Sequence, residues 1–170
     1  MNEIMKIMDT IEYGFLDKSL NDIFKDKDVE QAFCKVYYLM SPEELLAKKK
    51  GVCWDQVELE RKLFTDKNLK NETYFIYIDN HNSLPSHTFL VFYKNSKVYW
   101  FEHSWYDEKG IHEYDTLNEL LTDVKVKFLN SRKEEIEPSA AIHLYEYKKP
   151  KYHINCEEFY QYIFTQKKIY

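Results

Sequence analysis

Three polar residues, Cys53, His87 and Glu102, have the types and the order along the chain that nucleophilic chemistry needs. A thiol becomes a strong nucleophile when an imidazole takes its proton, and a carboxylate can hold that imidazole in the correct tautomer. We therefore predict that Cys53 is a thiol nucleophile that attacks a carbonyl to form a thioester, with His87 as base and Glu102 orienting the base. The Cys53 backbone N–H is the natural first donor to the oxyanion, and the sequence identifies no second donor.

The segment that follows Cys53 predicts the helix that would activate the thiol. Apolar residues recur at helical spacing from about residue 54 to residue 64, and Gly51 lets the backbone turn just before the cysteine. The unpaired N–H groups and the macrodipole at a helix N-terminus favour a thiolate. Asp55 places a negative charge two residues further on, which makes a histidine partner for Cys53 more important.

A predicted hairpin brings the histidine and the carboxylate together. Residues 87–94 and 97–104 read as two strands joined by a turn at Asn95-Ser96. Side chains alternate between the two faces of a strand, so an even-numbered loop places His87 and Glu102 on the same face. His103 then lies on the opposite face. The register therefore selects Glu102, and not His103, as the third member of the site.

The remaining elements predict an α+β fold in which N-terminal helices pack on a mostly antiparallel sheet. Further helices are expected over about 2–12, 29–40, 42–51, a dozen residues from 117, and 156–165, and further strands over 73–78 and 140–147. Ser41 with Glu44 and Thr116 with Glu119 form capping boxes at two of the helix starts. We expect one domain over residues 1–170, with a helical part to about residue 65, a sheet-rich part over about 73–147 and a C-terminal helix over 156–165.

Three segments resemble the transglutaminase-like superfamily, which has a papain-like cysteine protease fold. Gly51-Val52-Cys53-Trp54 is similar to the family's Gly-x-Cys-Trp segment at the catalytic helix, and the segment from His87 to Val91 looks like its histidine strand. Trp100-Phe101-Glu102 is similar to the next strand, where the family usually has Asp instead of Glu. The resemblance covers about residues 42–105. It implies amide hydrolysis, deamidation or transglutamination of a peptide or protein amide, by a Cys53-His87-Glu102 triad without a cofactor.

Two alternatives to this interpretation stay open. The fold can also serve as a binding domain without catalysis, since one fold commonly has more than one role. Alternatively, Cys156 is the nucleophile of a permuted papain-like enzyme. Asn155-Cys156-Glu157-Glu158-Phe159 resembles the Asn-Cys-Glu-His-Phe motif of lecithin:retinol acyltransferase-like proteins, although Glu158 replaces the motif's His. Cys34 lies within a predicted helix and is expected to be structural, as are Trp54 and Trp100 in the core.

Charge and composition narrow the classes of partner. The formal net charge is −5 and the basic runs are short, which argues against nucleic-acid binding. No apolar run approaches the roughly 20 residues that span a bilayer, and the N-terminal residues do not form a signal peptide. The three cysteines are therefore expected to be free thiols in the cytoplasm. His103, Asp107, His112 and Glu113 match no zinc pattern, so no metal site is expected.

Overall fold

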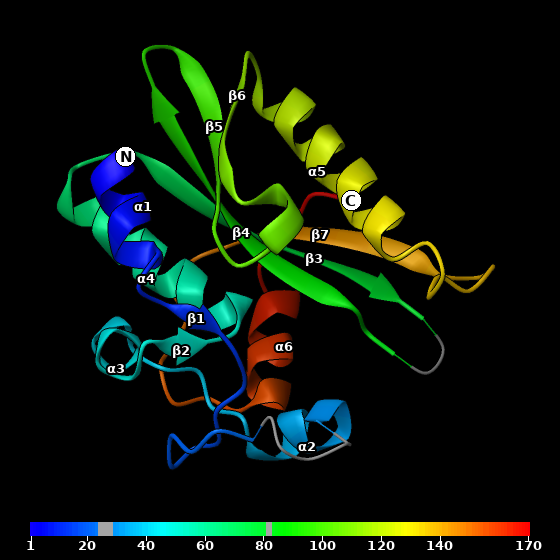
Figure 1. Cartoon of the computed structure of the whole chain (residues 1–170). Helices are drawn as coiled ribbons and strands as arrows, with labels where there is room; N and C mark the ends of the chain where they lie inside the picture. The colour runs from blue at the N-terminus through cyan, green and yellow to red at the C-terminus, as the bar shows by residue number, and fades with distance from the viewer. Residues whose placement is uncertain (24–28, 81–82) are drawn as a thin grey trace.

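The computed structural model describes residues 1–23, 29–80 and 83–170, and within them helices precede a large sheet (Figure 1). The elements are, in order, α1 (Asn2–Met8), β1 (Glu12–Tyr13), α2 (Val29–Val36), α3 (Pro42–Lys48), β2 (Lys50–Gly51), α4 (Cys53–Asp66), β3 (Asn71–Asp79), β4 (Ser86–Lys94), β5 (Lys97–Glu102), the 3₁₀ turn η1 (Tyr106–Glu108), β6 (Gly110–Tyr114), α5 (Leu117–Ser131), β7 (Ala141–Tyr147), α6 (Cys156–Phe164) and β8 (Lys167–Lys168). Six of them are α-helices, and the predicted α+β class is confirmed.

The main sheet has six strands in the order β6-β5-β4-β3-β7-β8, and every neighbouring pair is antiparallel. β1 and β2 form a separate parallel pair beside the start of α4. The sequence analysis did not predict β1, β2, β6 or β8. These strands are short, and local periodicity over two to five residues is too weak to indicate them.

Both faces of the sheet are covered, which gives two hydrophobic cores. α4 and α6 pack on one face, where Leu90, Phe92 and Phe101 are fully buried, and α5 covers the other face (Figure 1). β3 and β4 contribute side chains to both cores, which explains their nearly continuous apolar sequences. Trp54 belongs to the first core and Trp100 to the second, as predicted.

The hairpin between β4 and β5 has the predicted even-numbered turn. Asn95 and Ser96 have φ angles of 50° and 61°, which are the positive values of a type I′ turn. Lys94 pairs with Lys97, and the register continues to Leu90 opposite Phe101. The loop therefore preserves the parity on which the prediction for the site depends.

Two helix starts follow local capping, whereas the helix expected over 2–12 ends before the predicted residue, at Met8. The capping boxes of Ser41 with Glu44 and of Thr116 with Glu119 are both present. The helix expected over 29–40 instead ends at Val36. The backbone N–H of Met40 bonds to the carboxylate of Asp55, at 2.9 Å, so a tertiary contact holds the chain after Val36 outside the helix.

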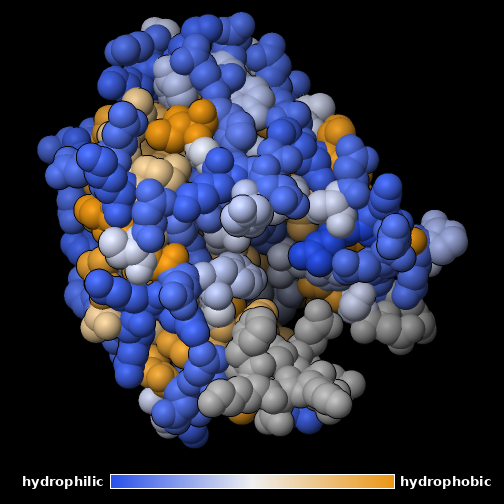
Figure 2. Space-filling model, in the orientation of Figure 1, coloured by the Kyte–Doolittle hydropathy of each residue, from blue (hydrophilic) through white to orange (hydrophobic). Residues whose placement is uncertain are grey.

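The face of the molecule drawn in Figure 2 is mostly hydrophilic, and its apolar side chains gather in separate patches. This distribution agrees with the two enclosed cores, which take up most of the large apolar residues. Within the described residues, no helix is both long and apolar enough to cross a membrane.

Candidate functional site

Cys53 is the first residue of α4 and the only free cysteine among the described residues. Its backbone N–H is at the first helical position, where a helix offers no internal acceptor. Gly51 allows the chain to pass close to α3 and α4, because a Cβ at this position would lie 2.7 Å from Leu45 Cδ1. Its φ is not in the left-handed region, so close packing rather than a special turn explains this glycine.

His87 and Glu102 form the predicted hydrogen bond, with 2.8 Å between Nε2 and Oε2. The second carboxylate oxygen of Glu102 accepts bonds from the Ser104 hydroxyl at 3.1 Å and from the Trp105 backbone N–H at 2.8 Å. Both oxygens are therefore held in place, and the carboxylate is 2% exposed. The predicted contact between His87 and Glu102 is confirmed, while the catalytic roles of the residues stay a prediction.

The His87 ring lies between the influences of the carboxylate and the thiol. Cys53 is among the groups that raise the pKa of His87, and because Glu102 occupies Nε2, the nitrogen that remains for the thiol is Nδ1. Burial disfavours the imidazolium, but the negative charges of Glu102 and Cys53 and the hydrogen bonds to both outweigh burial. Together they raise the pKa of His87 to about 10. This arrangement favours the imidazolium form of His87.

The site lies at the end of the β4–β5 ladder. The last pair of this ladder is Leu90 with Phe101, so both His87 and Glu102 lie beyond it. The indole of Trp105 packs edge-on against the His87 ring, with 5.4 Å between ring centroids. At the end of the ladder, groups from the sheet can meet the N-terminus of α4, which packs on β3 and β4.

Asp55 opposes the thiolate less than its position in the sequence suggests. Its carboxylate accepts bonds from the Tyr37 hydroxyl at 2.8 Å and from the backbone N–H groups of Met40 and Val52. Burial raises the pKa of Asp55 to about 7 in spite of these bonds, so the group is only partly charged near neutral pH. The bond to Val52, 3.0 Å long, also caps the helix that begins with Cys53.

His103 is held away from the His87 ring, as the parity predicted. Its Nδ1 is 2.7 Å from the side-chain oxygen of Gln56, and the Gln56 amide donates in turn to the carbonyl of Gly51. This chain of bonds braces the turn before Cys53. Desolvation by burial lowers the pKa of His103, with the positive charge of Lys109 acting in the same direction.

Glu60 is a buried carboxyl near the site that the sequence analysis missed. It is 3% exposed and follows Cys53 by seven residues, so both lie on the same face of α4. Burial first, and then the negative charge of Glu102, raise the pKa of Glu60 well above its usual value. Both causes favour the neutral form of the Glu60 carboxyl, which weakens its competition with Glu102 for the imidazolium. The sequence signal that could have identified Glu60 is its spacing of seven residues from Cys53 on the same predicted helix.

Cys53 opens onto a cleft with a volume of about 880 Å³. Its wall combines aromatic and apolar side chains with a few charged ones, as small-molecule and peptide sites do. The lining residues are Tyr13, Phe15, Phe33, Cys34, Val52, Cys53, Trp54, Asp79, Asn80, Ser83, Leu84, Pro85, Ser86, Arg132, Glu135, Cys156 and Tyr160. Cys53 is among these lining residues, with 6% of its surface exposed.

A family model described as a transglutaminase-like domain matches residues 2–114. The match runs from α1 to β6 and includes Cys53, His87 and Glu102. The chain belongs to the transglutaminase-like domain family. A search of the curated proteins finds no match to this chain. Family membership suggests a cysteine-dependent acyltransferase or hydrolase. The helix α6, which begins with Cys156, lies outside the matched residues.

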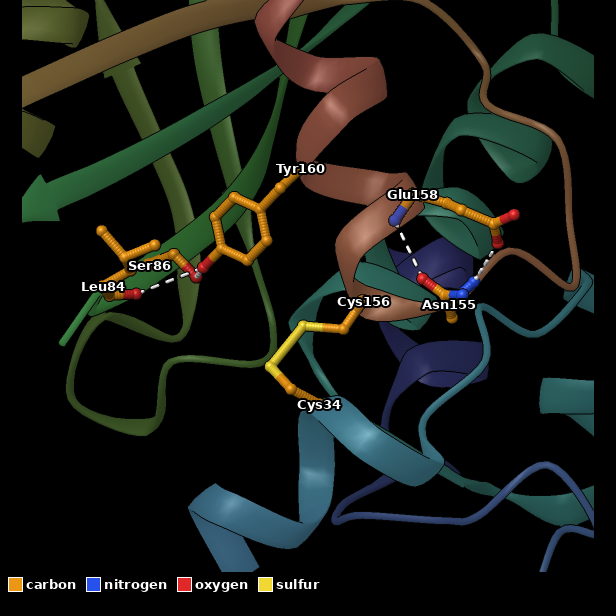
Figure 3. The surroundings of a disulfide bond; sticks show 7 residues. All are labelled: Cys34, Leu84, Ser86, Asn155, Cys156, Glu158 and Tyr160. Atoms are coloured by element: carbon orange, nitrogen blue, oxygen red, sulfur yellow. Dashed lines mark hydrogen bonds between the residues drawn. A yellow bond between two sulfur atoms is a disulfide. The ribbon is translucent and has the colours of Figure 1, made fainter.

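The prediction of three free thiols is wrong, because Cys34 and Cys156 form a disulfide (Figure 3). The bond joins α2 to the start of α6 across 122 residues of sequence, with 5.1 Å between the Cα atoms. Only the tertiary fold brings these two helices together, so no local pattern indicated the pair. Cys156 has no free thiol in this structure, which removes it as the nucleophile of a permuted site.

Loss of the disulfide should destabilise the fold. Closing a loop of this length restricts the unfolded chain, and removing such a crosslink commonly lowers the free energy of unfolding by roughly 2–5 kcal/mol. We expect the double variant Cys34→Ser/Cys156→Ser to unfold at a lower urea concentration than the wild type, measured by tryptophan fluorescence. A reducing agent should shift the wild type towards the variant and leave the variant unchanged. An identical midpoint for the reduced and oxidised wild type would contradict the crosslink.

Within the described ranges, no group of three or more His, Cys, Asp or Glu side chains is arranged to hold a metal ion. The histidines of the rejected zinc pattern have other partners. His103 bonds to Gln56, and Nε2 of His112 lies 2.7 Å from the carbonyl oxygen of Glu108.

Proposed function

We propose that this transglutaminase-like protein is a cysteine-dependent acyl-transfer enzyme that acts on peptide or protein amides. The observation that carries the proposal is the hydrogen bond between the His87 ring and the Glu102 carboxylate, together with Cys53 as one of the groups that raise the pKa of His87. Cys53 lies at a helix N-terminus and lines an open cleft. A buried thiol in a merely structural role would need neither a charged imidazole nor access to a cleft.

The first half of the reaction transfers the acyl group to the enzyme. His87 takes the proton of the Cys53 thiol, and the sulfur forms a bond to the carbonyl carbon of the amide. The π electrons of the carbonyl move to its oxygen, where the Cys53 N–H donates a hydrogen bond. When these electrons return to re-form the carbonyl, the C–N bond breaks and His87 gives its proton to the leaving amine. The product is a thioester on Cys53.

The second half of the reaction depends on the acyl acceptor. Water attacks the thioester to give a carboxylic acid, while a primary amine gives a new amide, and each route restores the thiol. Glu102 keeps Nε2 protonated throughout, so Nδ1 remains the nitrogen that exchanges protons. Mass spectrometry of the products formed with and without an added primary amine distinguishes hydrolase from transglutaminase activity.

The dependence of Cys53 alkylation on pH tests the ion pair. The raised pKa of His87, about 10, means that its positive charge is fully present below its usual value of 6.5 and is lost as the pH rises through 10. Iodoacetamide should therefore label Cys53 of the wild type at rates that change little between pH 6 and pH 9. In His87→Gln the rate should rise about tenfold per pH unit up to roughly pH 8.5, as for an ordinary thiol.

Peptide mapping measures both rates and assigns the labelled cysteine. Without a reducing agent, the label should be on Cys53, because Cys34 and Cys156 are joined. If the wild type shows the same pH profile as His87→Gln, the thiol is not activated. That result would favour the non-catalytic binding domain.

A further inference from the structure

Tyr13 is fixed beside the nucleophile by the short strand pair of β1 and β2. The two strands run parallel, and Tyr13 is the register partner of Gly51, two residues before Cys53. Two backbone bonds hold the pair, from Glu12 N to the carbonyl of Lys49 at 2.8 Å and from Gly14 N to the carbonyl of Gly51 at 3.3 Å. The backbone of β1 therefore has a defined position next to the N-terminus of α4 (Figure 1).

The side chain of Tyr13 faces the same cleft as the thiol of Cys53. The ring is 50% exposed and packs edge-on against Phe15, with 5.9 Å between the ring centroids. Among the described residues, none forms a hydrogen bond with the Tyr13 hydroxyl. As far as the described residues go, this hydroxyl is available to a molecule that enters the cleft.

The second tyrosine of the cleft differs in this respect. The hydroxyl of Tyr160 donates to the carbonyl of Leu84 at 3.2 Å and to the Ser86 hydroxyl at 3.3 Å (Figure 3). These bonds tie α6 to the start of β4. Tyr160 thus has a structural use for its hydroxyl, whereas the described residues offer none for the hydroxyl of Tyr13.

The electrostatic surroundings of Tyr13 keep its hydroxyl protonated. Desolvation in the cleft, and then the negative charge of Cys53, raise the pKa of Tyr13 well above its usual value, while Arg132 acts in the opposite direction. A protonated phenol can donate a hydrogen bond but cannot act as a base. Tyr13 and Cys53 line the same cleft, so a molecule bound there can meet both residues.

We propose that the Tyr13 hydroxyl is the second oxyanion donor, acting together with the backbone N–H of Cys53. The inference rests on the proposed acyl transfer at Cys53. As the C–S bond forms, the carbonyl π electrons move to oxygen, and the Tyr13 O–H donates a hydrogen bond to that oxygen without transferring its proton. When the electrons return, the C–N bond breaks, and His87 supplies the proton to the amine. A donor of this kind acts mainly in the transition state, so its loss lowers kcat more than it changes KM.

Two reactions of Cys53 separate this role from a structural one. Acylation by an activated ester passes through an oxyanion, whereas alkylation by iodoacetamide does not. For Tyr13→Phe we expect the acylation rate to fall on the order of 10²- to 10³-fold. The alkylation rate should stay within about twofold, because the ion pair with His87 is intact. Tyr99→Phe is the matched control, since it removes a hydroxyl that bonds to Glu113 at the far side of the hairpin.

Each outcome of the comparison decides the proposal. A selective loss of acylation in Tyr13→Phe, with Tyr99→Phe unchanged, supports Tyr13 as the oxyanion donor. Equal acylation rates of the wild type and Tyr13→Phe would overturn this assignment and leave the acyl-transfer proposal intact. Parallel losses of acylation and alkylation would also overturn it, because Tyr13 would then position the thiol. A wild-type protein that is alkylated but never acylated would overturn both the function and the role of Tyr13.

Discussion

Replacing Cys53 by alanine is expected to abolish acyl transfer and to leave the fold intact. Cys53 is the only free cysteine in the described part of the chain, and its sulfur is one of the groups that raise the pKa of His87. Loss of the nucleophile from a catalytic triad commonly lowers the turnover rate on the order of 10⁴- to 10⁶-fold. The side chain is small and lies at the start of α4, so alanine removes one sulfur atom without breaking the helix.

The measurement is the formation of a thioester with an activated ester, followed as a mass increase of the intact protein. The matched control is Cys34→Ser/Cys156→Ser, which removes the other two sulfurs and keeps Cys53. This control should still form the thioester, measured at a temperature well below its unfolding transition. Thioester formation by Cys53→Ala would show that the nucleophile lies elsewhere.

Glu102→Gln is expected to lower acyl transfer on the order of 10³- to 10⁴-fold, as the loss of the carboxylate does in other triads. Glutamine keeps the volume of the side chain but removes the negative charge, so the pKa of His87 should fall towards its usual value. The amide can also present an N–H to Nε2. This contact would favour the tautomer with its proton on Nδ1, which cannot accept the proton of Cys53.

His103→Gln is the control for this prediction, because residue 103 lies next to Glu102 and faces the other way. Its ring contacts Gln56 and lies 3.6 Å from the carboxylate of Asp9, and neither contact involves His87 or Glu102. We expect a lower melting temperature at most, with the acylation rate within several-fold of the wild type. The assignment of Glu102 is wrong if both variants lose activity equally, or if Glu102→Gln keeps full activity.

The sequence by itself determined the parts of this protein that depend on periodicity and register. The position of Cys53 at a helix start and the capping boxes are local features of a few adjacent residues. The contact of His87 with Glu102 spans fifteen residues, yet strict alternation along two strands and a two-residue turn were enough to predict it. The family resemblance and the α+β class follow from the same segments.

Only the tertiary structure decided which distant groups complete the surroundings of the thiol. Tyr13 reaches the cleft because β1 pairs with β2, and two-residue strands have no periodicity to detect. The disulfide of Cys34 with Cys156 depends on the packing of α2 against α6. The helix α2 ends at Val36, because the carboxylate of Asp55 binds the backbone N–H of Met40 and holds the following residues outside the helix. In each case, residues far apart in the chain interact, and the energy of such a contact exists only once the chain has folded.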